Sequence, residues 1–187
     1  MARWFLLCSL AACKAKQPEV APGDLARIEV TLDGELDEPA WNHTALRGVF
    51  VDATGAIARP YSEVRLLRDD TRLVVALYAG DEDIRSTDKF ELVAGALSTT
   101  ITPTGVASDP RVELKVDTDG TIDQPTDDDE EWVVEAAMPL AALGPPPIAI
   151  TASRCDVVKS GERRCGSYRT SISPAIGASD RDPASRR

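Results

Sequence analysis

Two acidic clusters are the part of the sequence best suited to binding a hard cation. Asp127 to Glu131 is an unbroken acidic run, and Asp81-Glu82-Asp83 follows a strongly apolar segment. Several carboxylate oxygens within one loop suit calcium, although neither cluster has the alternating spacing of a known calcium loop. A solvated acidic run is the alternative for both clusters. The candidate calcium ligands are Asp81, Asp83, Asp127 and Asp129; we expect no other cofactor.

The same carboxylates do not predict catalysis. Paired acids serve glycosidases, but adjacent acids in a polar loop lack the apolar neighbours that raise the pKa of a general acid. His43 is the only histidine in the chain, so a histidine-based metal cluster is excluded. The sequence contains no Gly-x-Ser-x-Gly elbow and no phosphate-cradling loop. We therefore expect a protein that is not an enzyme.

The N-terminal residues predict export. Arg3 precedes a short apolar run that ends in Leu10-Ala11-Ala12-Cys13, a pattern that resembles the bacterial lipobox. The resemblance implies that residues 1–12 are a signal peptide and that Cys13 is lipidated, which gives stable anchoring through more than one acyl chain. An ordinary secretion signal, or an apolar start on a cytosolic product, remains the alternative.

A lipid on Cys13 implies a location in the bacterial cell envelope. Lys14 stands where an aspartate retains some lipoproteins at the inner membrane, which favours the outer membrane. Residues 13–24 are then a flexible tether to a domain at 25–177, and residues 178–187 are expected to be a disordered tail. The chain has no second apolar stretch of membrane length, so the lipid is the expected membrane contact.

The charge of the chain limits its partners. The formal net charge is −10 at pH 7, which repels polynucleotides and anionic lipid head groups. Nucleic acid is therefore excluded as a partner.

The two remaining cysteines of the exported chain are predicted to form a disulfide. Cys155 and Cys165 flank a polar segment that can fold back at Ser160, so that the two cysteines face each other across a hairpin. Directly opposed strand residues lie within the distance a disulfide needs. Two thiols without a nearby histidine make a metal site the weaker alternative.

Short segments of alternating or continuous apolar residues, separated by turn residues, indicate β-structure throughout. The run Leu73–Tyr78 is apolar at nearly every position, which predicts a central strand covered on both faces. Pro139–Gly144 suits one helical turn. The pattern predicts an all-β, antiparallel β-sandwich of jelly-roll type with about nine to ten short strands. The expected strands are 25–32, 49–51, 62–68, 73–78, 90–93, 97–102, 112–116, 132–137, 148–153 and 168–172.

An ordered set of motifs resembles carbohydrate-binding module family 9 (CBM9). The opening segment resembles an "I-D-G-x-L-D-E-x-x-W" start, a later one an "x-V-R-x-L-W-D-D…L-Y-V" hairpin, and another "W-x-V-E-x-A-I-P". The matches run in order through nearly the whole expected domain. They are Leu32–Trp41, Ser62–Leu77, Asp81–Ile84, Trp132–Leu140 and Ser167-Tyr168.

The resemblance implies a site for a sugar chain end. Members that bind sugar clamp it between two tryptophans, with a Glu and an Arg bonding its hydroxyls. Glu91 matches the acidic position, Thr100 stands at the Arg position, and both tryptophans are missing. We expect a ligand site centred on Glu91, with Tyr168 or Tyr61 as the stacking surface.

The sequence thus predicts a non-catalytic, carbohydrate-binding-like lipoprotein that holds a glycan or a related polar ligand at the cell surface. The alternative is an envelope adaptor that has lost the sugar site and binds another protein. An exposed aromatic residue beside Glu91 favours the first, and a flat apolar patch or an uncovered sheet edge favours the second.

Overall fold

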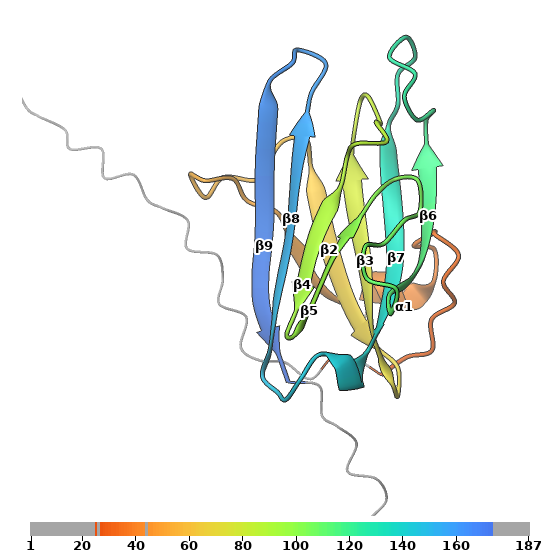
Figure 1. Cartoon of the computed structure of the whole chain (residues 1–187), viewed down its shortest axis with the longest axis vertical. Coiled ribbons are helices and arrows are strands. Elements are labelled where there is room, and N and C mark those ends of the chain that lie inside the picture. The colour runs from red at the N-terminus through yellow and green to blue at the C-terminus, as the bar shows by residue number, and fades with distance from the viewer. Residues whose placement is uncertain (1–24, 26, 44, 174–187) are drawn as a thin grey trace, which may run out of the picture.

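The computed structural model describes residues 25–173, apart from Ala26 and Thr44, as two antiparallel β-sheets stacked face to face (Figure 1). The proposed signal peptide, Cys13, the tether at 13–24 and the tail at 178–187 all lie outside the described residues. No helix among the described residues is long and apolar enough to cross a membrane.

Nine strands make up the sandwich, within the predicted number. The five-stranded sheet has the order β1 (Leu46–Val49), β2 (Ser62–Arg68), β3 (Arg72–Gly80), β7 (Glu131–Pro139) and β6 (Glu113–Asp119). The four-stranded sheet has the order β5 (Leu97–Ile101), β4 (Phe90–Ala94), β8 (Ile148–Val157) and β9 (Arg163–Ile172). The described part of the chain also contains two short helices: α1 (Pro39–His43) and the 3-10 turn η1 (Leu140–Ala142), which lies in the predicted helical turn.

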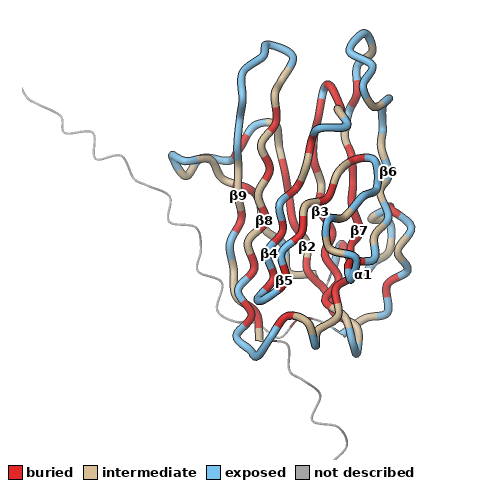
Figure 2. Tube along the Cα trace, in the orientation of Figure 1, coloured by how far each residue is buried: buried red, intermediate tan, exposed pale blue. Residues whose placement is uncertain are grey.

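The main core fills the space between the two sheets. Buried residues run along the strands of both sheets, and exposed residues gather in the connecting loops (Figure 2). Phe90 lies at its centre, with its ring 4.7 Å from that of Trp132 and 5.9 Å from that of Phe50. Removing these large apolar side chains from water is the main force that holds the sheets together.

A second, smaller core covers the outer face of the five-stranded sheet. Leu73, Val75 and Leu77 face the main core, whereas Val74 and Ala76 pack outwards in the smaller cluster. Strand β3 is therefore buried on both faces, as its unbroken apolar run predicted. The cover on the outer side is the segment from Val30 to α1, whose Trp41 is fully buried.

One buried carboxylate fixes this cover to the sheet. Glu135 of β7 lies opposite Ala76 and accepts a hydrogen bond of 2.7 Å from the indole Nε1 of Trp41. Its other oxygen accepts the backbone N–H groups of Asp33 and Gly34 at 2.8 and 3.0 Å. Burial raises the pKa of Glu135, and these three donors oppose that rise.

The prediction of a strand at 25–32 is wrong. Val30 is buried and Glu29 and Thr31 are exposed, so the alternation is real. The described residues of this segment form only a parallel bridge from Arg27 to Arg68, with Ile28 donating its N–H to the Arg68 carbonyl at 2.9 Å. Because β1 and β3 already pair with the two edges of β2, no continuous edge remains for it.

The hairpin of β8 and β9 confirms the predicted disulfide. Cys155 pairs with Cys165 across the two strands, and a disulfide joins them. Asp156 and Arg164 are the next pair towards the turn, so the hairpin folds back around Ser160 as expected.

The bond between Trp41 and Glu135 predicts a difference between two tryptophans. Both Trp41 and Trp132 are fully buried, but the Nε1 of Trp132 has no hydrogen-bond partner among the described residues. Trp41→Phe should therefore destabilise the protein by about 1.5–3 kcal/mol more than Trp132→Phe, because only Trp41 loses a bond to a charged acceptor. Denaturant unfolding of both variants measures the difference, and equal losses would contradict a stabilising role for this bond.

Candidate functional site

A polar cleft of about 580 Å³ opens at the end of the sandwich where β3 finishes. In Figure 1 this end is the upper one, from which the β8–β9 hairpin and the connection from β6 to β7 protrude. Four separate segments supply the walls, so the fold and not one loop creates the cleft. The residues that line it are Arg59, Pro60, Tyr61, Gly80, Asp81, Glu82, Asp83, Glu130, Asp156, Val158, Lys159, Ser160 and Arg164.

Arg154 holds the floor of the cleft together. Its guanidinium donates to Asp81 at 2.6 Å and to the carbonyl of Gly80 at 2.9 Å, and it lies 3.3 Å from Asp156. The side chains of Arg154, Asp81 and Asp156 are each 2–3% exposed. Charges buried to this degree persist only when they are paired, so the cluster ties the end of β3 to β8.

The floor contains more negative than positive charge. Asp88, also buried, brings a carboxylate oxygen within 4.8 Å of those of Asp81 and Asp156. Burial raises the pKa of Asp88 to about 6, and the neighbouring carboxylates add to the rise while the backbone N–H of Arg85 and the charge of Arg154 oppose it. Burial likewise raises the pKa of Asp156, against the attraction of Arg154.

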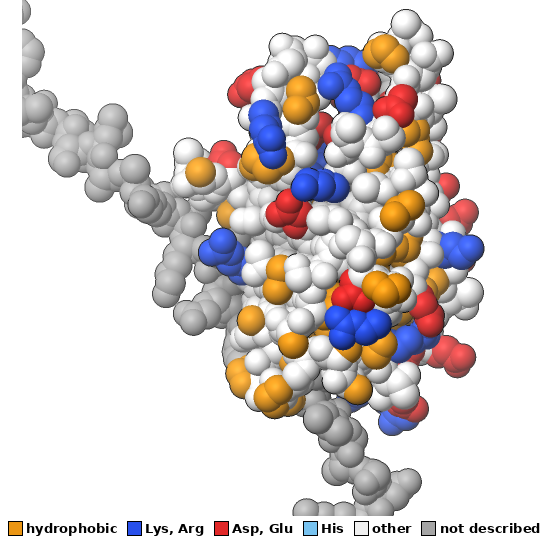
Figure 3. Space-filling model, viewed as in Figure 1, with side chains coloured by type: hydrophobic (Ala, Val, Ile, Leu, Met, Phe, Trp, Pro, Cys, Tyr) orange, Lys and Arg blue, Asp and Glu red, His pale blue; other side chains and the backbone are white. Residues whose placement is uncertain are grey.

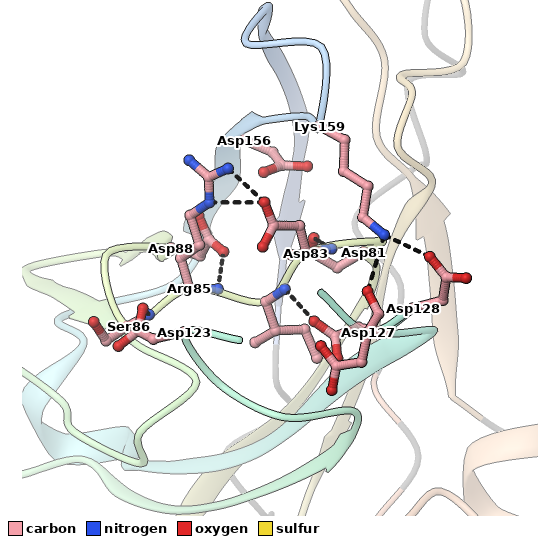
Figure 4. A network of polar contacts seen from close by, with 12 residues as sticks. Asp81, Asp83, Arg85, Ser86, Asp88, Asp123, Asp127, Asp128, Asp156 and Lys159 are labelled. Carbon is pink, nitrogen blue, oxygen red and sulfur yellow. Dashed lines mark hydrogen bonds and ion pairs between the residues drawn. The ribbon is translucent and has the colours of Figure 1, made fainter. Parts of the chain in front are cut away.

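The rim of the cleft carries ion pairs both between loops and within a loop (Figure 4). Lys159, from the β8–β9 turn, donates to the carboxylate of Asp128 at 2.6 Å and to the carbonyl of Asp127 at 3.0 Å. Asp83 accepts from the guanidinium of Arg85. The contacts of Lys159 connect the turn to the acidic run before β7, whereas the Asp83–Arg85 pair lies within one loop.

Tyr61 is the aromatic residue in the lining of the cleft. Its hydroxyl donates to Glu63 at 2.8 Å, and its ring meets that of Tyr78 edge-on with centroids 6.0 Å apart. Burial, together with the bond to Glu63, raises the pKa of Tyr61 to about 12, so the phenol stays protonated at neutral pH. Two fixed contacts hold the ring in place.

Glu91 and Thr100 do not lie with Tyr61 in the cleft. They oppose each other on β4 and β5 and face outwards from the four-stranded sheet, with Ser153 as the other neighbour of Glu91. Glu91 is 56% exposed and forms an ion pair of 3.0 Å with Lys89. The face seen in Figure 3 carries interspersed acidic and basic side chains with scattered hydrophobic ones.

Tyr168 is not a stacking surface beside Glu91. It opposes Ala152 on the inner face of the sheet and is buried in the main core. Its ring covers Gly48, where an added Cβ would come within 2.0 Å of it. Because strand side chains alternate between faces, Glu91 and Tyr168 lie on opposite sides of the same sheet, and the prediction that placed them in one site is corrected.

The four candidate calcium ligands also lie in different settings. Asp129 accepts the backbone N–H groups of Ile84 and Thr121 at 2.6 and 2.8 Å, so both of its oxygens are used within the fold. Asp83 is paired with Arg85, while the carbonyl of Asp127 accepts from Lys159. The buried carboxylates that the structure brings together with Asp81 are instead Asp88 and Asp156.

Two structures of CBM9 modules from Caldicellulosiruptor kristjanssonii are similar to this fold. The module in complex with glucose has a TM-score of 0.60 at 13% sequence identity, over 85% of this chain and 98% of its own. The module in complex with cellotriose has a TM-score of 0.57 at 15% identity, over 76% of this chain and 81% of its own. This domain has a CBM9-like fold. No family model matches the sequence, and a search of curated proteins also finds no match.

The CBM9-like domain contains site residues that the sequence did not reveal. Arg154, Asp156 and Asp88 stand among apolar or loop residues, and each looks ordinary by itself. The hairpin register offers one signal, since it places Asp156 opposite Arg164 next to the disulfide. Nothing in the local sequence shows that Lys159 reaches Asp128, because that contact joins residues 31 positions apart.

The raised pKa of Asp88 predicts a pH-dependent effect of Asp88→Asn on stability. Between about pH 4 and pH 6 the unfolded chain loses the proton of this group while the folded domain keeps it, so the group destabilises the fold as pH rises through this window. Asp88→Asn should thus be close to neutral below pH 4 and stabilising by about 1–3 kcal/mol above pH 6. The side-chain oxygen that accepts the Arg85 N–H at 2.7 Å is retained in the amide.

Denaturant unfolding at a series of pH values measures this difference. Asp123→Asn is the matched control, since Asp123 is an exposed carboxyl that accepts the N–H of Ser86 and its pKa is lowered. A stability difference for Asp88→Asn that does not vary with pH would contradict the assignment.

Proposed function

We propose that this chain is a non-catalytic carbohydrate-binding domain of a bacterial cell-envelope lipoprotein, and that it holds a glycan or a related polar ligand in the cleft beside Tyr61. The likeness in fold to two modules solved with glucose and cellotriose supports the ligand class. A fold alone does not determine where a ligand binds, so we place the ligand from the residues that line the cleft.

The observation that carries the proposal is an aromatic residue, Tyr61, in the lining of a polar cleft. Sugars present apolar C–H faces with hydroxyls around their edges, and binding sites match them with a ring and a few placed polar groups. Tyr61 offers the ring, Glu82 and Glu130 offer exposed acceptors, and Arg59, which is exposed and forms no ion pair with a described residue, offers a donor. The face around Glu91 offers the carboxylate that the family resemblance singles out, but neither Tyr168 nor Tyr61 stands beside it.

The pairing of the acids supports a binding role without catalysis. A glycosidase needs one carboxyl group that gives up a proton and a second that acts as a base or nucleophile across the sugar. In the cleft, Asp81 is neutralised by Arg154, and Asp83 by Arg85. These pairs suit a fixed, preorganised surface better than proton transfer.

The adaptor alternative finds less support in the surface. The exposed large hydrophobic side chains among the described residues belong to separate segments; they are Val49, Ile57, Val93 and Val106. Strand β6 is at the edge of its sheet, but every second residue of it is charged and exposed, from Glu113 to Asp119. Charges of this kind discourage pairing with another strand.

Binding of cellotriose tests the position of the ligand. Tyr61→Ala should weaken the affinity at least tenfold, about 1.4 kcal/mol, because it removes the aromatic ring, whereas Tyr61→Phe keeps the ring and should retain most of the affinity. Isothermal titration calorimetry up to millimolar ligand gives the comparison. Glu91→Gln is measured in parallel: loss of binding in Glu91→Gln, with Tyr61→Ala unchanged, would place the ligand on the sheet face and refute the cleft.

Lipidation of Cys13 tests the cellular part of the proposal. Expressed in a bacterium with lipoprotein processing, the protein should fractionate with membranes and gain the mass of acyl chains, and Cys13→Ala should abolish both. Cys8→Ala, within the proposed signal peptide, is the matched control and should change neither. A wild-type product that begins at another residue and carries no lipid would exclude the anchor.

A further inference from the structure

We infer that the cleft beside Tyr61 selects sugars that carry a positive charge, namely amino sugars with a free ammonium group. The inference rests on the proposed function, because it names the class of sugar that the same cleft takes. Two observations support it: acidic side chains outnumber basic ones around the cleft, and most of the basic side chains already form ion pairs.

Acidic side chains outnumber basic ones along the lining of the cleft. The acids are Asp81, Glu82, Asp83, Glu130 and Asp156, and the bases are Arg59, Lys159 and Arg164. Outside the lining, Arg154 is paired with Asp81 and Arg85 with Asp83, while Asp88 adds a further buried carboxylate. The hollow as a whole therefore has a negative potential, and its low-dielectric floor strengthens that potential for a ligand inside it.

The basic groups at the rim are largely occupied by acids outside the lining. Lys159 bonds Asp128 at 2.6 Å, and Arg164 bonds Glu162 at 2.7 Å. Among the described residues, Arg59 is the lining cation for which no ion pair is found. The lining bases thus do little to neutralise the lining acids.

Three acids remain with capacity to accept a donor from a ligand. Glu82 and Glu130 are exposed at the mouth, and neither forms an ion pair with a described residue. Deeper in, the side chain of Asp156 is 3% exposed, and its Oδ2 has no hydrogen-bond partner among the described residues, although Arg154 lies 3.3 Å away. A buried acceptor without a hydrogen bond is costly, and an N⁺–H donor would satisfy it.

The shape of the cleft favours a sugar over a bare cation. At about 580 Å³ it has the volume of a small-molecule site, and an aromatic residue, Tyr61, belongs to its lining. A metal ion would use neither. An amino sugar would place its ring against Tyr61 and its ammonium group towards the acids.

The experiment compares four probes on the purified full chain at pH 6.5 by calorimetry. They are the glucosamine trimer, its fully N-acetylated counterpart, cellotriose, and butylamine as an ammonium group without a sugar. The glucosamine trimer should bind at least tenfold more tightly than cellotriose or the acetylated trimer, and the ratio should fall as salt is raised. Butylamine should bind more weakly than the glucosamine trimer.

Two sets of variants assign the preference to the cleft. Glu82→Gln combined with Glu130→Gln removes exposed charges, and Asp156→Asn removes the buried one, so each should reduce the preference for the glucosamine trimer over cellotriose at least threefold. Glu113→Gln is the matched control, because it removes an exposed acid of β6 at the opposite end of the sandwich. Unfolding curves of all variants report whether the fold is kept. If Asp156→Asn is unstable, the double variant Glu82→Gln with Glu130→Gln still tests the preference.

The outcomes separate this inference from the proposed function. Equal binding of cellotriose and the glucosamine trimer overturns the charge preference and leaves the carbohydrate-binding function standing. Binding of butylamine as tight as that of the trimer overturns the sugar class. Failure of every saccharide to bind overturns the proposed function itself, and the inference with it.

Discussion

The buried carboxylate of Glu135 ties the N-terminal segment to the five-stranded sheet, and the middle of that sheet depends on this contact. Without the cover that ends in Trp41, the outward side chains Val74 and Ala76 of β3 would face water. A carboxylate buried so completely is tolerated because three donors surround it. These three hydrogen bonds offset the cost of burying the carboxylate, and they also fix the N-terminal segment against the sheet.

A central strand that is buried on both faces gives the cleft a rigid base. Strand β3 runs through the middle of the sheet and ends at Gly80, where the chain turns into Asp81 and the cleft begins. Arg154 of β8 then joins this end to the second sheet through Asp81 and the Gly80 carbonyl. The two sheets are held together by apolar packing along their length and by one buried ion-pair cluster at this end.

Most of the fold could be predicted from the sequence because its signals are local. Alternation and turn residues located the strands from Ser62 onwards, and the symmetry of the hairpin around Ser160 located the disulfide. The predicted strand at 25–32 failed because pairing depends on which edges of β2 remain free, which no local pattern records. Alternation in that segment reported burial against Trp41, not membership of a sheet.

The candidate site was predicted less well, for two different reasons. The position of Tyr168 was within reach of the sequence: the register that pairs the cysteines also pairs Tyr168 with Ala152, an inward position next to Ile150. The grouping of Asp88, Asp156 and Arg154 was not, since it brings strand β8 next to a loop that is distant in the chain. Tyr61 was predicted to be an aromatic ligand residue beside Glu91, but it lies in the lining of the cleft and not beside Glu91.

Nuclear magnetic resonance mapping of the sugar is the most direct measurement of the central claim, that the cleft holds the ligand. The backbone amides of the ¹⁵N-labelled protein report the site when cellotriose is added to millimolar concentration. The largest shift changes are expected on residues 61, 80–83 and 156–164, around the cleft. Changes centred on Glu91, Thr100 and Ser153 of the outer sheet face, with the cleft unaffected, would contradict it.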